Sequence, residues 1–268
     1  MKYQFFILLF LLMLGSCKES PVPIPDFELP DTERVVLIEY LTGVKCPNCP
    51  KGSAALKNIE ASFPGKIAIV AVHGRLQTEP LSVSKYDFRT DISNRLEALH
   101  NPFLGKPAAL LNRIKFPDEP FVPVDFVDLW PSYIEDILRT EYSVNLLSDV
   151  RFDAASRKID LNISMLPVEN LEPGYRLSVF VTEGGIIDAQ ETIGSIIPDY
   201  VHDHVLRAML SDVSGDPIVD ALVKDQPLVK TYSYLLPANF SAEHIELIVA
   251  VSRPDGTIDQ ALKTKIVP

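Results

Sequence analysis

The chain has 268 residues, a length that suits one large domain or two modest ones. Apolar residues make up 47% and charged residues 23%, which is typical of a folded globular protein and excludes a disordered one. The formal net charge is −11 and no basic run stands out, so the composition argues against a nucleic-acid partner, which needs clustered Lys and Arg. With three Cys, the chain cannot form a disulfide-dense scaffold.

Residues 1–16 have the pattern of an export signal peptide that ends just before Cys17. Residues 5–14 form an unbroken apolar run, which is too short for a bilayer span of about 20 residues. The segment 14–17 resembles the bacterial lipobox, which implies cleavage before Cys17 and lipidation of its thiol with palmitate-type acyl chains. Lys18 after the Cys favours the outer membrane. A plain cleaved signal and an uncleaved anchor are the alternatives.

The mature chain is expected to have three parts after this signal. Residues 17–32 are rich in Pro, whose spacing favours an extended stalk between the lipid and the folded protein. Residues 33–145 and residues 146–268 are predicted to be separate domains, because the pattern of apolar residues changes near residue 145.

Residues 33–145 alternate strand-like and helix-like patterns. Buried strands are predicted at 35–41, 67–72 and 108–111. Helices are predicted at 54–63, 86–100 and 126–138. This α/β order calls for a sheet that is covered by helices.

Residues 146–268 show mostly the two-residue alternation of half-buried strands, punctuated by Gly-containing turns. The predicted strands are 150–152, 159–165, 176–182, 229–235, 245–252 and 258–266. Their spacing predicts an all-β, immunoglobulin-like sandwich. Residues 200–210 are either a helical turn or a bent strand.

The chemistry suggested by the sequence depends on the segment Cys46-Pro47-Asn48-Cys49, between the first strand and the first helix. Two Cys at this spacing can close a small disulfide ring. A helix N-terminus lowers the pKa of a nearby thiol, and Lys45 adds a positive charge. We therefore expect Cys46 to be the exposed attacking sulfur and Cys49 to be the resolving sulfur.

The order of strand, Cys-x-x-Cys and helix resembles the thioredoxin superfamily over residues 33–142. The resemblance implies that Pro107 is a cis-proline facing the dithiol and that Lys106 lies beside the sulfurs as a substrate-binding residue, with Lys45 nearby. It also implies a buried acid under the second Cys. Glu39 is the nearest candidate, although it is one position out of register.

A narrower resemblance extends over nearly the whole chain. The lipobox, the segment 42–50, Pro107 followed by Asn112-Arg113, and the segment 200–207 are similar to the outer-membrane-protein-28-related lipoproteins. That family implies a thioredoxin-like domain joined to a β-sandwich at the cell envelope. It does not name a substrate.

Other interpretations of the same residues remain open. The Cys pair could be half of a zinc site with His73 and His100, or a purely structural disulfide. His202 and His204 would share one face on a strand and are weak candidates for a metal, although a hydrogen-bonding network suits them better. No metal, cofactor or nucleotide is otherwise predicted.

Two functions follow from these residues. The chain could be an envelope thiol–disulfide oxidoreductase whose partner is an envelope or extracellular protein with a thiol or disulfide. Alternatively, it is a surface-exposed binding or adhesion lipoprotein in which Cys46 and Cys49 form a structural disulfide.

Overall fold

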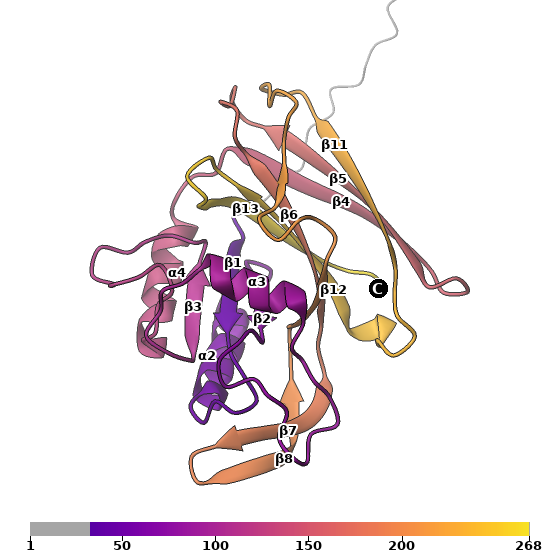
Figure 1. The fold of residues 1–268 in the computed structure, drawn as a ribbon. Coiled ribbons are helices and arrows are strands. Elements are labelled where there is room, and N and C mark those ends of the chain that lie inside the picture. Colours follow the sequence, from indigo (N-terminus) through magenta and orange to yellow (C-terminus); the bar gives the residue numbers. More distant parts are fainter. Residues whose placement is uncertain (1–32, 268) are drawn as a thin grey trace, which may run out of the picture. The chain divides into compact units, whose positions relative to one another are not determined.

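The computed structural model describes residues 33–267, so the predicted signal peptide, the predicted lipidation site Cys17 and the predicted stalk lie outside the described residues. The described residues, 33–267, form one compact unit. The protein is mostly β, with mixed and antiparallel sheets (Figure 1).

The elements follow one another in two groups. The first group contains β1 (Val36–Leu41), α2 (Cys49–Ser62), β2 (Ile67–Val72), α3 (Asp91–Leu99), β3 (Ala108–Leu111), a 3₁₀ turn η2 (Val127–Leu129) and α4 (Trp130–Leu138). The second contains β4 (Val144–Asp153), β5 (Lys158–Pro167), β6 (Arg176–Glu183), β7 (Ile186–Thr192), β8 (Ser195–His202), β9 (Val205–Met209), β10 (Asp216–Pro217), β11 (Leu228–Leu235), a 3₁₀ turn η3 (Ala242–His244), β12 (Ile245–Ser252) and β13 (Ile258–Lys265).

β1 and β2 form the centre of the first group, and both are buried along their whole length. They pair in parallel, while β3 pairs antiparallel with β1. Their side chains alternate between two cores: α2 and α4 cover one face of the sheet, and α3 covers the other. Continuous apolar runs are what a strand buried on both faces requires, which is why these strands were predictable.

Local interactions explain where two of the helices that cover this sheet begin. α3 begins with a reciprocal cap, in which Thr90 Oγ1 accepts the Ser93 N–H and Ser93 Oγ accepts the Thr90 N–H. α4 begins at Trp130, which is fully buried and donates its indole N–H to the Val124 carbonyl. This contact ties α4 to the segment that runs alongside β3.

The second group contains two layers of antiparallel strands. β4, β5 and β11 form a sheet of their own, and its inner side chains pack against those of β6 and β12 in a shared apolar core. The alternation of buried and partly exposed residues along β5 matches this arrangement. The segment 200–210 is strand, divided between β8 and β9, rather than a helical turn.

The two groups are joined in one sheet, ordered β13-β12-β6-β9-β2-β1-β3 with β10 on β6. β9 of the second group pairs in parallel with β2 of the first, where the Ala71 N–H donates to the His204 carbonyl at 2.8 Å. Phe180 and Ile248 from the second group lie in the same core as Leu37 and Leu96 from the first. The change of pattern near residue 145 therefore falls between α4 and β4, inside a single compact unit.

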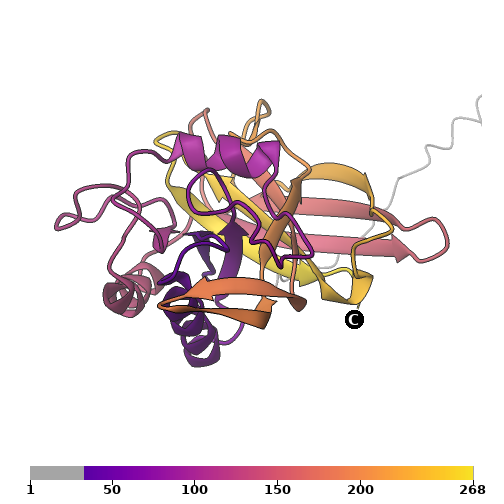
Figure 2. The ribbon, with the colours of Figure 1, turned by 60° about the horizontal axis from the view of Figure 1, so that its bottom comes forward.

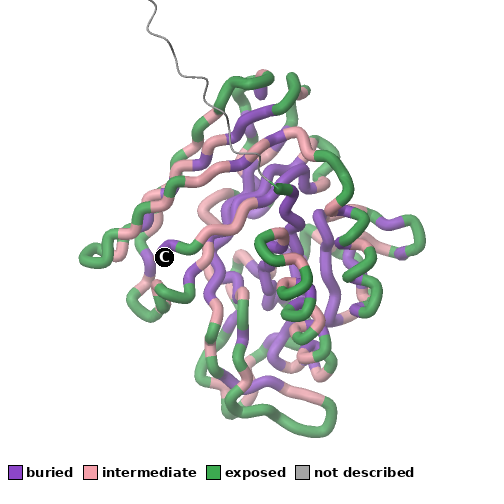
Figure 3. The backbone as a smooth tube through the Cα atoms, turned by 180° about the vertical axis from the view of Figure 1, so that it is seen from behind, coloured by how far each residue is buried: buried purple, intermediate pink, exposed green. Residues whose placement is uncertain are grey.

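The strands β7 and β8 form a separate two-stranded hairpin, which was not among the predicted strands. The hairpin lies alongside α2 (Figure 2). Its tip is exposed, at the bottom of the view in Figure 3.

Candidate functional site

The two Cys of the predicted site form a disulfide, with their Cα atoms 5.3 Å apart. The helix begins at Cys49, with Pro50 in its first turn, so Cys46 lies before the helix and Pro47 is not its first residue. Two successive turns separate β1 from α2: the Cys46 N–H donates to the Gly43 carbonyl and the Cys49 N–H donates to the Cys46 carbonyl. The helix Cys49–Ser62 therefore begins after these turns and before the start of the predicted helix, 54–63.

The expectation that Cys46 is exposed is wrong. Cys46 has an exposed fraction of 0% and Cys49 of 1%. A thiolate must reach a sulfur of the disulfide to exchange with it, so this burial closes the direct route of attack.

The β7–β8 hairpin binds the loop that carries Cys46. The Glu191 N–H donates to the Val44 carbonyl at 2.8 Å. The side-chain amide of Gln190 donates to the carbonyls of Gly43 and Cys46, at 3.2 and 3.1 Å. Because Gln190 is buried, these bonds are shielded from water and hold the hairpin against the loop.

A buried carboxylate fixes the base of the hairpin. Asp188 is fully buried, and its two oxygens accept the backbone N–H groups of Lys85 and Tyr86 at 2.8 and 3.0 Å. Hydrogen bonds to an ionised acceptor are among the stronger ones in proteins. The hairpin is therefore tied both to the loop before α2 and to the segment before α3.

Tyr40, on β1, contacts the segment 46–49 that carries the disulfide. Its hydroxyl donates to the Cys49 carbonyl at 2.7 Å, and burial raises the pKa of this phenol to about 12. A Cβ on Gly52 would lie 2.7 Å from the Tyr40 hydroxyl and 3.0 Å from Pro107 Cβ, so a glycine here lets α2 approach both residues. Tyr40 was not among the predicted site residues, although the alternation along β1 puts it on the face that carries α2.

Glu39 lies on the opposite face of β1 from Tyr40. Its carboxylate accepts two hydrogen bonds from the Arg113 guanidinium, at 2.7 and 2.8 Å, and lies 3.5 Å from His100. Burial opposes its ionisation, but Arg113 and His100 hold the pKa of Glu39 well below its usual range. The structure therefore places Glu39 in an ion pair rather than beneath the disulfide.

The two lysines of the predicted site have different surroundings. Lys106 has no exposed side-chain surface, and its ammonium contacts the Glu97 carboxylate at 2.7 Å and donates to the carbonyls of Thr42 and Leu76. Lys45 is partly exposed and lies 4.0 Å from Glu79. Lys106 therefore fixes the loop before α2 rather than presenting its charge to solvent.

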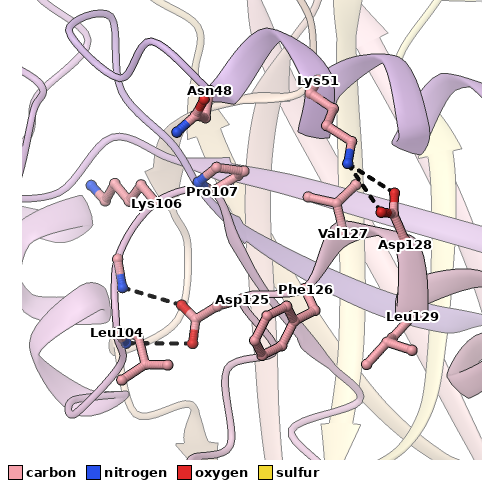
Figure 4. Close-up of a pocket in the computed structure, with 11 residues that line it drawn as sticks. Asn48, Lys51, Leu104, Lys106, Pro107, Asp125, Phe126, Val127, Asp128 and Leu129 are labelled. Atoms are coloured by element: carbon pink, nitrogen blue, oxygen red, sulfur yellow. Dashed lines mark hydrogen bonds and ion pairs between the residues drawn. The ribbon is translucent and has the colours of Figure 1, made fainter.

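An open pocket of about 690 Å³ adjoins the start of α2 (Figure 4). Asn48, between the two Cys, and Pro107 line the same pocket, and the Lys106–Pro107 peptide bond is cis. On its far wall, Asp125 accepts the backbone N–H groups of Leu104 and Gly105, and burial raises the pKa of this carboxyl. The pocket thus brings Pro107 close to the Cys segment but does not expose the sulfurs.

A second pocket of about 560 Å³ lies between α2 and the β7–β8 hairpin. Its walls include His73, which directly follows β2, and His202, the last residue of β8. Burial lowers the pKa of His73 to about 3 and that of His202 to about 4, so both rings are neutral near pH 7.

His202 and His204 do not act as a pair. His204 has a φ of 57°, which turns the chain between β8 and β9. Its ring contacts Glu60 at 3.1 Å and Glu246 at 3.8 Å, and although burial opposes protonation, these two carboxylates raise the pKa of His204 to about 9. The ring of His202 instead packs against Phe88 and Tyr200.

Within residues 33–267, no group of three or more His, Cys, Asp or Glu is arranged to hold a metal ion. In the same part of the chain, no helix is both long enough and apolar enough to cross a bilayer.

Comparison with known proteins identifies one family. The model of the family described as outer membrane protein Omp28 matches residues 100–267. No curated protein matches the chain.

Solved structures share the fold at low sequence identity. HBP35 of Porphyromonas gingivalis is 15% identical, with a TM-score of 0.69 over 87% of this chain and 76% of that chain. Protein AGR_C_4864 from Agrobacterium tumefaciens is also 15% identical, with a TM-score of 0.50 over 88% of this chain and 96% of that chain. At this identity the likeness concerns the fold alone.

Proposed function

The chain belongs to the Omp28 family of outer membrane proteins, and from this premise we propose that it is a lipid-anchored binding protein of the outer membrane. In this proposal the Cys46–Cys49 disulfide is structural: it holds the loop on which the β7–β8 hairpin rests. The partner is an envelope or extracellular protein, or another surface ligand.

The lipid anchor is supported by the lipobox-like segment that ends at Cys17. Incorporation of labelled palmitate into the expressed chain, and its loss in Cys17→Ser, would test this anchor. Release of Cys17→Ser from the membrane fraction is expected, since one lipidated residue would provide the attachment. Protease treatment of intact cells would then distinguish the periplasmic face from the cell surface.

We propose that residues 33–145 are a thioredoxin-like scaffold and that residues 146–268 are an immunoglobulin-like sandwich. The order of β1, α2, β2, α3, β3 and α4 supports the first part, as does the position of Pro107 against Gly52. The two packed layers of antiparallel strands support the second. A fold of this kind does not establish an activity, so the state of the site has to decide the function.

One observation carries the structural role of the disulfide: neither Cys46 nor Cys49 has more than 1% of its surface exposed. The β7–β8 hairpin is held against the loop that contains Cys46 by specific hydrogen bonds from Gln190 and Glu191. Exchange with another protein would first require these bonds to break.

The rate of disulfide reduction tests this proposal. In the full oxidised chain, reduction by dithiothreitol should be slow in buffer and should rise by orders of magnitude in a denaturing concentration of urea. Gln190→Ala should speed reduction in buffer, because it removes the two hydrogen bonds from the Gln190 amide that hold the β7–β8 hairpin against the loop before α2. Glu135→Gln, at an exposed position of α4, is the matched control and should leave the rate unchanged. A native rate equal to the rate in urea would refute the structural role.

The position of the Cys pair favours a second candidate, a thiol–disulfide oxidoreductase. A Cys-x-x-Cys segment that precedes a helix and lies near Pro107 can stabilise a thiolate once it is uncovered. In cells, Cys49→Ala would then trap mixed disulfides between Cys46 and partner proteins. Covalent partners that disappear in Cys46→Ser would favour the enzyme, and a lack of any such partner would favour the structural role.

A further inference from the structure

The β7–β8 hairpin exposes a cluster of large aliphatic side chains to which nothing above assigns a role. Ile187, Ile193 and Val201 are 50%, 79% and 49% exposed, and Ile196 and Ile197 are exposed as well. Figure 3 shows the hairpin tip among the exposed segments of the chain. Soluble proteins rarely expose contiguous apolar surface of this kind unless it binds a partner.

Strand pairing puts three of these aliphatic side chains on one face of the hairpin. Ile187 lies directly opposite Val201, and Glu191 lies directly opposite Ile196. Directly opposite residues share a face, and positions 187 and 191 of β7 are an even number of residues apart, so all four side chains share one face. These four residues form the hairpin face. Gln190 belongs to the other face, which contacts the loop before α2, so the hairpin face points away from that loop.

The outer edge of β8 is open as well. β8 is exposed at six of its eight positions, and among the described residues it pairs only with β7. The Glu191 N–H donates to the Val44 carbonyl, away from β8, so the backbone groups of the opposite residue, Ile196, point away from β7. Pro198 has no N–H to donate, so the segment before it, 195–197, is where an added strand can pair.

The charges that border the hairpin face are negative. The segment 184–206 contains no Lys or Arg, and besides the buried Asp188 it carries Glu191, Asp199 and Asp203, of which Asp199 and Asp203 are exposed. An apolar face bordered by carboxylates complements apolar side chains that are accompanied by Lys or Arg. It disfavours a second copy of this chain, which would bring like charges together, and it disfavours an anionic lipid surface.

The described chain begins at the end of β1 that is away from the hairpin. Residue 33 lies just before Val36, the first residue of β1, whereas the hairpin contacts the loop that follows Leu41, the last residue of β1. A strand of this length separates the two ends by about 20 Å. An anchor at Cys17 would connect at the first of these ends, so the position of the hairpin favours a protein partner over the anchoring membrane.

We propose that the hairpin face and the adjoining edge of β8 bind an extended segment of another protein, in which apolar side chains alternate with Lys or Arg. The apolar side chains of that segment pack on Ile187, Ile196 and Val201. Its basic side chains meet the carboxylates of Glu191 and Asp199, and its backbone pairs with β8 at Ile196. The inference rests on the proposed function, a binding protein, and names the chemistry of its partner.

Fluorescence anisotropy with two synthetic peptides of equal length tests the proposal on the oxidised Cys17→Ser chain, which lacks the predicted lipid. One peptide alternates Val and Lys, and the other alternates Val and Glu. The Val–Lys peptide should bind at one per chain, and the Val–Glu peptide should bind at least tenfold more weakly, because its carboxylates would face those of the hairpin.

Two sets of variants locate the binding surface. Ile187→Ser with Val201→Ser should weaken binding of the Val–Lys peptide at least tenfold, whereas Val219→Ser, at an exposed Val elsewhere, is the matched control and should bind as the unaltered chain does. Asp199→Asn should weaken binding about threefold, and Glu135→Gln, which removes the same charge from α4, should leave it unchanged. Equal weakening by Asp199→Asn and Glu135→Gln would show non-specific attraction to an acidic chain and would overturn the proposal.

Hydrogen exchange gives a readout that does not depend on whether the hairpin variants fold. With the Val–Lys peptide bound, the amide of Ile196 should exchange more slowly, because its N–H would then donate to the peptide. Failure of this peptide to bind, or protection of amides only outside residues 187–201, would overturn the proposal.

Two further measurements identify the other possible occupants. Light scattering of the Cys17→Ser chain alone should report a monomer, and vesicles that contain phosphatidylglycerol should not bind it. A dimer, or vesicle binding, that is lost in Ile187→Ser with Val201→Ser would assign the hairpin face to a second copy or to a membrane and would overturn the proposal. Neither result bears on lipidation of Cys17 or on the slow reduction of the disulfide, so the proposed function is tested separately.

Discussion

The buried ion pair between Glu39 and Arg113 allows a quantitative test of how this fold is held together. Glu39 is fully buried, and two hydrogen bonds of 2.7 and 2.8 Å join it to the guanidinium. Glu39→Gln keeps the shape but leaves the Arg113 charge without a counter-ion, and its amide N–H₂ faces a donor. Removing one partner of such a pair costs about 3–5 kcal/mol.

Urea unfolding measures this loss directly. The chain has one Trp, Trp130, which is fully buried on α4 and reports the folded state by fluorescence. Glu135→Gln is the control, because Glu135 pairs with Arg139 on the surface and such a pair contributes only about 0.3–0.5 kcal/mol. Replacing both partners, as Glu39→Met with Arg113→Met, should recover much of the loss.

The pH dependence of stability has a definite sign for Glu39. Its pKa in the folded protein lies well below the unfolded value of about 4.3. Its contribution is therefore complete above that value and is lost as the pH falls toward the folded pKa. The stability difference between the unaltered chain and Glu39→Gln should shrink below pH 4. If Glu39→Gln lowers the free energy of unfolding by less than about 1 kcal/mol at pH 7, the ion pair does not stabilise the fold to the expected extent.

Three further outcomes are expected. The double variant Cys46→Ser, Cys49→Ser should keep the near-ultraviolet circular dichroism spectrum of the folded chain. Its free energy of unfolding in urea should fall by about 2 kcal/mol, because the disulfide closes only a small ring. An unfolded variant would contradict this. Gly43→Ala should lower the free energy of unfolding by about 1–3 kcal/mol or more, because its Cβ would lie 2.2 Å from the Gln77 carbonyl oxygen. An unchanged midpoint of urea unfolding would contradict this. The pKa of His204 is raised to about 9, so the stability from its pair with Glu60 is complete below the unfolded value of about 6.5 and is lost as the pH rises through 9. His204→Gln should abolish this dependence in urea titrations across pH 6–10, and a dependence that persists would assign it to another group.

The sequence by itself determined the features that depend on local pattern. Mostly apolar runs predicted β1 and β2, because a strand buried on both faces is apolar at most positions; in β1 the buried exception is Glu39, which pairs with Arg113. The period-two alternation predicted β5 and its neighbours. The Cys pair, Pro107 and the segment 200–207 pointed to the Omp28 family, and the match of the family model to residues 100–267 confirms it.

The tertiary structure alone decided the state of the site. Cys46 is buried in the folded chain, and Gln190, 144 residues further along the sequence, hydrogen-bonds its backbone carbonyl. Tyr40 rather than Glu39 contacts the disulfide segment, since Glu39 pairs with Arg113 on the other face of the strand. Patterns of a few residues record which face of an element is apolar, but they do not record which distant segment covers that face. The burial of the disulfide, and therefore its reactivity, depends on which distant segment covers it.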